Sequence, residues 1–351
     1  MKQTIKKILV LGVFAAICAI LLTGITNIRE ASAVTTLNMA TPWPERMECV
    51  TGWEKYFAKE LEKRTNGEYK IKIYWNESLG KTASFPDMVQ QGGADLASLV
   101  PGFYPSRFPL SQVTNQLWFV NKSLDEAFAA AKAIYWEGPI PEELASQNMK
   151  LLYVDVLPPY QLWSYKTIKS TSEMKGQRIR SWGPYMPLIY EAVGAVGVTL
   201  VASDWFEAMQ KRMVDGGFYS VDVGMGVKIE EVAKYINMVN MGYNTGPMVV
   251  MNMDRWNKLP PDVKKIFEEL MAEMPAVGKK VVEDAEQASI QRAKDIGLVF
   301  VPFEDREKWV EALPDLQQIW LDEMKEKGLG EEATEILNRW NATLKKIREG
   351  N

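Results

Sequence analysis

The chain has 351 residues, a formal net charge of −4 at pH 7, two cysteines and no histidine. The absence of histidine excludes Ser-His-Asp and Cys-His hydrolase sites and His-ligated zinc sites. The acidic balance argues against a nucleic-acid-binding surface, which requires clustered basic residues. Catalysis by carboxylates or lysine alone is not excluded.

Residues 1–33 have the pattern of an export signal. Three lysines within the first seven residues precede an apolar run over 8–25, and a small-residue cleavage site ends at Ala33. The run is long for a signal peptide and short for a membrane span, so an uncleaved N-terminal anchor is the alternative. Cleavage after Ala33 predicts a periplasmic protein in which only Cys49 remains, so that no intramolecular disulfide can form.

The first half of the exported chain alternates strand and helix patterns. We predict, in order, a strand over 35–40, a helix over 49–63, a strand over 69–73, a helix over 84–91 and a strand over 94–97. This rhythm predicts an α/β fold with a mostly parallel sheet and helices on both faces. Such sheets bind ligands beyond the carboxyl ends of their strands.

The second half predicts a further lobe and several crossings between the lobes. The expected elements are a loop over 101–110, a helix over 124–136, strands over 149–157 and 161–165, strands near Ile179, Val198 and Val221, a strand over 247–252, a helix over 263–295 interrupted at Pro275, and a helical tail over 306–349. We predict lobe 1 from residues 34–157 and 247–280. Lobe 2, with the hinge and the C-terminal helices, takes residues 158–246 and 281–351.

Arg180 is the main candidate for a binding residue. It lies at the end of a short strand in the segment MKGQRIRSWG, where a permanently charged, forked guanidinium suits one carboxylate. The alternative is a structural salt bridge to an acid such as Asp204. Arg178, two residues earlier, is interpreted as a solvated or structural arginine.

Several segments in sequence order resemble one known family. They are WEKYFAKELEKRTNGEYKIKIYWNESLG, GGADLASLVPGFYPSRFPL, MKGQRIRSWG, FEAMQKRMVDG and MNMDRWNKLPPDVKKIF. Together they resemble the solute-binding subunit of TRAP (tripartite ATP-independent periplasmic) transporters of the dicarboxylate-binding type.

The resemblance implies a two-lobed periplasmic-binding-protein-like fold with hinge strands and a long hinge helix, closing around one small organic acid. It also implies a monomer without enzymatic activity, which delivers its ligand to a sodium-coupled membrane permease. We expect no cofactor and no metal-binding residues. Arg180 matches the family's carboxylate-binding arginine.

Two departures from the family pattern restrict the ligand. Tyr160 stands where many members carry a second arginine, and Gly217-Phe218-Tyr219-Ser220 replaces an asparagine or an acid–tryptophan pair. One positive anchor among aromatic rings predicts a monocarboxylate with a hydrophobic or aromatic body.

Aromatic residues at predicted strand ends and loops are the other candidates. They are Trp43, Phe103, Tyr104, Tyr160, Trp163, Trp182, Phe218 and Tyr219. We expect about three to line the pocket, with Trp182, Tyr160 and Tyr219 first, and the rest to fill the core. Asn244 and Thr245 are candidate hydrogen-bond donors before a hinge strand.

Two other functions fit the same sequence. A ligand-binding sensor subunit for a membrane receptor would use the same cleft. An exported carboxylate-based hydrolase would need a pair of essential acids, and no spacing in the chain singles out such a pair.

Overall fold

The computed structural model describes residues 34–201 and 204–350. The predicted export signal and its alternative, a membrane anchor, both fall in residues 1–33 and lie outside the described residues. Within the described ranges, no helix is long and apolar enough to cross a membrane. One compact unit begins at Thr36 and holds the helices and both sheets.

The strands form two mixed sheets. The first has the order β2 (Tyr69–Tyr74), β1 (Thr35–Ala40), β3 (Leu96–Leu99), β10 (Asn244–Asn252) and β4 (Met149–Leu157). The second has the order β11 (Val299–Pro302), β9 (Tyr235–Met238), β5 (Gln161–Ser164), β8 (Gly216–Tyr219), β6 (Arg178–Ser181) and β7 (Val196–Thr199).

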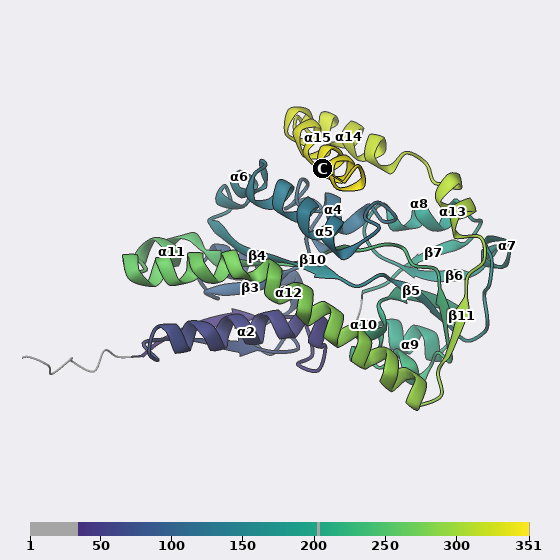
Figure 1. The fold of residues 1–351 in the computed structure, drawn as a ribbon, viewed down its shortest axis with the longest axis horizontal. Helices are drawn as coiled ribbons and strands as arrows, with labels where there is room; N and C mark the ends of the chain where they lie inside the picture. Colours follow the sequence, from purple (N-terminus) through teal and green to yellow (C-terminus); the bar gives the residue numbers. More distant parts are fainter. Residues whose placement is uncertain (1–33, 202–203, 351) are drawn as a thin grey trace, which may run out of the picture. The chain divides into compact units, whose positions relative to one another are not determined.

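The helices separate and cover these strands (Figure 1). They are α2 (Glu48–Arg64), α3 (Phe85–Gln90), α4 (Val113–Gln116), α5 (Leu124–Ala131), α6 (Ile140–Ala145), α7 (Thr171–Met174), α8 (Met186–Glu191), α9 (Trp205–Gln210), α10 (Val221–Gly226), α11 (Met253–Lys258), α12 (Pro261–Asp295), α13 (Arg306–Ala312), α14 (Leu316–Glu326) and α15 (Gly330–Arg348). Short 3₁₀ turns lie at Thr82–Ser84, Pro101–Phe103 and Ile229–Glu231, and a π-helical turn lies at Lys132–Trp136.

The chain passes between the two sheets at several places. β4 ends at Leu157 and β5 begins at Gln161, while β9 ends at Met238 and β10 begins at Asn244. The long helix α12 starts beside α11 and leads to β11 of the second sheet (Figure 1). These crossings agree with the predicted hinge strands and hinge helix, although the exact lobe boundaries stay a prediction.

The parallel pairing is less complete than the sequence pattern predicts. β1 pairs with β3 in parallel, but β10 is antiparallel to both β3 and β4. In the second sheet, β6 is parallel to β7 and β8, whereas β5 is antiparallel to β8 and β9. The strands β5 and β10, which are antiparallel to both of their neighbours, each directly follow a crossing between the sheets.

Two predicted elements differ in the structure. The strand expected near Val221 is β8, which ends at Tyr219, and Val221 itself begins α10, because the Ser220 hydroxyl accepts a hydrogen bond from the Val223 amide at 3.3 Å. The helix expected to break at Pro275 is continuous.

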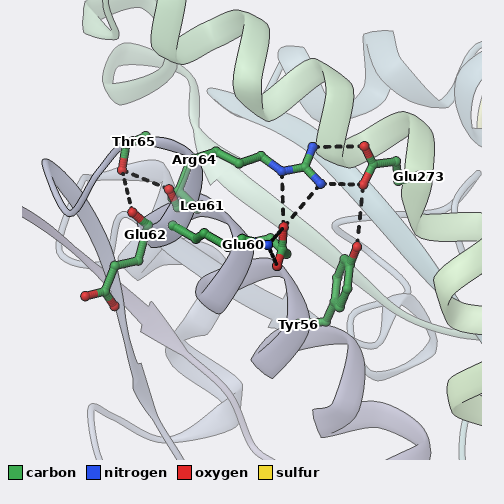
Figure 2. Close-up of polar contacts among 8 residues, drawn as sticks. Tyr56, Glu60, Leu61, Glu62, Arg64, Thr65 and Glu273 are labelled. Carbon is green, nitrogen blue, oxygen red and sulfur yellow. Dashed lines mark hydrogen bonds and ion pairs between the residues drawn. The ribbon is translucent and has the colours of Figure 1, made fainter.

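Helices α2 and α12 pack against each other over the first sheet. Gly278 of α12 permits this contact, since a Cβ there would lie 1.9 Å from Cη2 of Trp53. Val249 and Met251 of β10 face the core that these helices share. At the end of α2, Arg64 donates to both carboxylate oxygens of Glu273 at 2.9 and 2.7 Å (Figure 2), so a bidentate ion pair joins the two helices.

Candidate functional site

A cavity of about 30 Å³ lies where strands of both sheets end. Its lining is almost wholly apolar and aromatic and consists of Trp43, Met47, Val50, Val100, Phe103, Trp118, Leu157, Tyr160, Trp182, Tyr219, Val223, Gly246 and Pro247. Four of these residues directly follow or end β3, β4, β6 and β8. The cavity therefore occupies the place where open α/β sheets bind ligands.

Four aromatic rings form one wall of the cavity. Trp118 and Tyr160 lie with ring centroids 4.3 Å apart, and Trp182 lies 6.1 Å from Tyr160. Tyr219 meets Tyr160 edge-on at 5.5 Å. The predicted first choices, Trp182, Tyr160 and Tyr219, are thus brought together on this wall, and Trp43 and Phe103 also line the cavity.

Arg180 lies beside this wall and is 1% exposed. Its guanidinium carbon is 4.7 Å from the ring centroid of Trp182, 5.2 Å from Tyr219 and 6.0 Å from Trp205. We call these three rings the aromatic cage. The Nε of Arg180 donates to the Leu200 carbonyl at 3.3 Å, but neither Nη1 nor Nη2 of Arg180 has a hydrogen-bond partner in the described part of the chain. Arg180 is therefore not held in a bidentate structural salt bridge, which is the alternative to a ligand-binding role.

Arg178 on the same strand has a different environment. It is exposed, and its Nε and Nη2 donate to the Asp215 carboxylate at 3.1 and 2.9 Å. The Asp215 carboxylate also accepts from the Arg178 amide at 2.9 Å. The interpretation of Arg178 as a structural arginine agrees with this pairing.

Two buried tyrosines near Arg180, Tyr160 and Tyr190, have raised pKa values. Burial raises the pKa of Tyr160 well above its usual value, with a further increase from Tyr219 and an opposing effect of the Arg180 charge. Burial also raises the pKa of Tyr190, whose hydroxyl donates to the Arg180 carbonyl at 3.3 Å. Neither of these two tyrosines supplies a negative charge for the Arg180 guanidinium at neutral pH.

Three of the aromatic candidates lie outside the cavity lining. Phe218 is on the opposite face of β8 from Tyr219 and packs against Tyr190 at 5.7 Å. Trp163 donates from Nε1 to the Tyr219 carbonyl at 3.3 Å, and Tyr104 donates its hydroxyl to the Thr82 carbonyl at 2.6 Å. The contacts of these three side chains are therefore with other parts of the protein and not with the cavity.

The polar candidates at the start of β10 are buried behind the lining. The Thr245 hydroxyl lies 2.5 Å from that of Thr114, which in turn lies 2.9 Å from the Tyr135 hydroxyl. Asn244 accepts from the Thr245 amide at 2.9 Å, and its Nδ2 has no partner among the described residues. Neither residue is part of the cavity lining.

Sequence reasoning missed two aromatic residues of the site. Trp118 lines the cavity, and Trp205 belongs to the aromatic cage of Arg180. Trp118 lies in the run Leu-Trp-Phe-Val, which reads as ordinary core, and Trp205 begins a helix. Within the described ranges, no group of three or more metal-binding side chains is placed to hold a metal ion.

Comparison with known proteins places the chain among solute-binding proteins. The model of the family "Bacterial extracellular solute-binding protein, family 7" (DctP) matches residues 39–327. A solute-binding protein of Verminephrobacter eiseniae is 24% identical over 263 residues, which are 73% of this chain and 76% of that protein.

Two solved structures are similar to the whole described fold. A TRAP periplasmic solute-binding protein from Desulfovibrio salexigens with bound orotic acid has a TM-score of 0.79 and 20% identity, over 89% of this chain and 99% of that one. A TRAP solute-binding protein from Rhodoferax ferrireducens in complex with copurified benzoate has a TM-score of 0.79 and 20% identity, over 90% of this chain and 99% of that one. The predicted two-lobed α/β fold is confirmed by these similarities.

Proposed function

The chain belongs to family 7 of the bacterial extracellular solute-binding proteins, the DctP family, and from this premise we propose that it captures a small monocarboxylate with a hydrophobic or aromatic body and delivers it to a TRAP membrane permease. Members of this family are binding proteins of transporters rather than enzymes, which removes the hydrolase alternative. We further propose that the protein works in the periplasm as a monomer.

The observation that carries the ligand proposal is the unpaired guanidinium of Arg180. A buried charge without a partner is costly, so a fold keeps one where a ligand supplies the missing partner. Two unpaired terminal nitrogens in a planar fork match the two oxygens of one carboxylate. The aromatic cage fixes the plane of this fork through its contacts with the guanidinium.

The lining of the cavity restricts the rest of the ligand. No lysine or arginine is among the described residues that line it, since Arg180 lies beside the lining, and tryptophan, tyrosine, phenylalanine and aliphatic side chains make up most of it. A second carboxylate would therefore be desolvated without a partner. The related proteins solved with benzoate and orotic acid, each a ring that bears one carboxyl group, favour a flat monocarboxylate.

Binding requires a more open conformation than the one described. The cavity of about 30 Å³ is far smaller than the several hundred cubic ångströms typical of ligand pockets, and the terminal nitrogens of Arg180 are covered. We propose that lobe 1 (34–157 and 247–280) and lobe 2 (158–246 and 281–351) separate at the crossings 158–160 and 239–243. The ligand would then stabilise the closed arrangement.

Titration calorimetry with benzoate and orotate tests the proposal. Arg180→Ala should weaken binding by about 100-fold or more, because it removes two charge-assisted hydrogen bonds from a buried site. Arg178→Ala is the matched control on the same strand and should bind like the wild type, because its partner is Asp215. Near wild-type affinity in Arg180→Ala, or no binding of any ring monocarboxylate by the wild type, would refute the assignment.

A further inference from the structure

Trp118 contributes a hydrogen-bond donor that nothing in the described part of the fold uses. The side chain is 2% exposed and lines the cavity, and its indole Nε1 has no hydrogen-bond partner among the described residues. An unsatisfied buried N–H costs free energy, and each one in a folded protein calls for an explanation.

Other buried tryptophans of the same chain have their indole N–H groups paired. Trp53 donates to the Cys49 carbonyl at 3.0 Å, and Trp309 donates to the Ile189 carbonyl at 2.8 Å. Trp340 donates to Oδ1 of Asn121 at 2.9 Å. Among the described tryptophans, the indole nitrogens that are fully shielded from solvent and still lack a partner are those of Trp118 at the cavity and Trp205 in the aromatic cage.

The backbone next to Trp118 is held in a costly conformation. Phe119 has a φ of 66°, which is a genuine outlier for a bulky residue. The conformation is fixed by a hydrogen bond from the Phe119 amide to the Met241 carbonyl at 2.7 Å, at the crossing between β9 and β10. The Phe119 ring then packs on Trp309 at 5.8 Å, while Trp118 lies at the cavity. These contacts fix the position of Trp118 at the cavity in the closed arrangement.

Trp118 and Arg180 serve different parts of the site. Trp182 contacts both, with its ring 4.7 Å from the guanidinium and 6.4 Å from the Trp118 ring. The rings of the aromatic cage that contact Arg180 do not include Trp118. An indole N–H only donates, so its partner is an acceptor atom, and a position apart from the guanidinium places that atom away from the carboxylate.

We infer that Trp118 is a specificity-determining residue whose N–H donates to a neutral oxygen or nitrogen acceptor on the body of the ligand. This rests on the proposed function and narrows it: the substrates are ring monocarboxylates that carry a second, uncharged hydrogen-bond acceptor. A site built to donate such a bond discriminates against analogues that lack the acceptor, because the donor is then left unpaired.

The test compares ligands of equal shape with and without an acceptor. Calorimetry at pH 7.5 measures binding of benzoate and of the three pyridinecarboxylates, in which one ring C–H is replaced by a nitrogen acceptor. In the wild type, at least one pyridinecarboxylate should bind roughly 3- to 10-fold more tightly than benzoate, as one neutral hydrogen bond allows. Trp118→Phe should bring this ratio to about one. The control Trp256→Phe, at a tryptophan that packs against Phe267 in the core of the first sheet, should keep it.

Each other result has a distinct meaning. If the wild type binds benzoate and all pyridinecarboxylates equally, or if Trp118→Phe keeps the ratio, the inference is wrong and the proposed function stands. If Trp118→Phe weakens benzoate and the pyridinecarboxylates by the same factor, the N–H serves the carboxylate and the inference is also wrong. If none of these acids binds, the proposed function itself fails. Should Trp118→Phe not fold, β-(3-benzothienyl)alanine at position 118 removes the N–H with the ring shape kept, and the same ratio decides.

Discussion

Arg180 combines full burial with two terminal nitrogens that no described residue accepts from. Ring contacts and the single bond from Nε to the Leu200 carbonyl offset only part of the cost of removing the charge from water. Without ligand, Arg180 should therefore lower the free energy of unfolding, which is a common property of binding-site residues.

A substitution that removes the Arg180 charge should therefore weaken ligand binding but stabilise the ligand-free protein. Arg180→Met keeps most of the side-chain volume and removes the unpaired charge, so the free energy of unfolding without ligand should rise by about 1 kcal/mol. Urea unfolding of the ligand-free protein measures it, with Arg178→Met as the exposed control whose midpoint should change little. A loss of stability in Arg180→Met would mean that the cage contacts outweigh the buried charge.

Residues at strand ends are predictable from the sequence, and residues placed by long-range contacts are not. Trp182, Tyr160 and Tyr219 line the cavity near strand ends, where ligands of such sheets bind, and Arg180 lies beside two of these rings. The sequence places both Phe218 and Tyr219 at the cleft, yet neighbours on a strand face opposite sides, so only one of them can line it. Trp118 depends on the positive φ of Phe119 and the contact with Met241, which no local pattern reveals.

At the scale of elements, periodicity predicts most helices and strands but not how the strands are ordered. The strand over 149–157 and the long helix after Pro260 agree closely with β4 and α12. The insertion of β10 between β3 and β4 joins residues far apart in the chain, so its antiparallel direction could not be deduced from either segment alone.

The ion pair between α2 and α12 gives a prediction for these two elements (Figure 2). Arg64 binds Glu273 bidentately and also reaches Glu60. The hydrogen bonds and charge of Arg64 lower the pKa of Glu273, and hydrogen bonds from Lys63 and then Arg64 lower the pKa of Glu60. Glu273→Gln should lower the free energy of unfolding at pH 7 by about 0.5–1 kcal/mol, a modest value because the Glu273 side chain is 42% exposed.

The pH dependence of this effect has a definite sign. A lowered folded-state pKa stabilises above the ordinary carboxylate pKa, and the contribution is lost as the pH falls through the folded-state value. The difference between wild type and Glu273→Gln in urea unfolding should therefore shrink in acid. Asp284→Asn, which removes an exposed pair with Lys280 on the same helix, is the control and should have a smaller effect. A difference that grows in acid would contradict the ion pair as its source.

At the scale of the whole molecule, the core of the first sheet holds acids that the ion pairs do not neutralise. Burial raises the pKa of Glu54 to about 8, against lowering hydrogen bonds from Thr41 and Ser98. Asp155 is fully buried with both carboxylate oxygens unpartnered among the described residues, and burial together with the Glu54 charge raises its pKa well above the usual value. Burial likewise raises the pKa of Glu143 and Glu286 to about 7.

These acids predict a protein that loses stability as the pH rises toward neutrality. A raised pKa means that the folded state keeps a proton that the unfolded chain releases, so between about pH 4.5 and pH 8 the free energy of unfolding falls with pH. Each such group contributes up to about 1.4 kcal/mol per pH unit between its unfolded-state and folded-state pKa values.

Glu54→Gln fixes the neutral form of this side chain. It should make the fall in the free energy of unfolding between about pH 5 and pH 8 shallower by nearly that amount, as measured by urea unfolding at each pH. Glu331→Gln, on the exposed start of α15, should leave the slope unchanged. An identical slope in Glu54→Gln and wild type would mean that Glu54 is ionised in the folded protein and that a partner of its charge remains to be found.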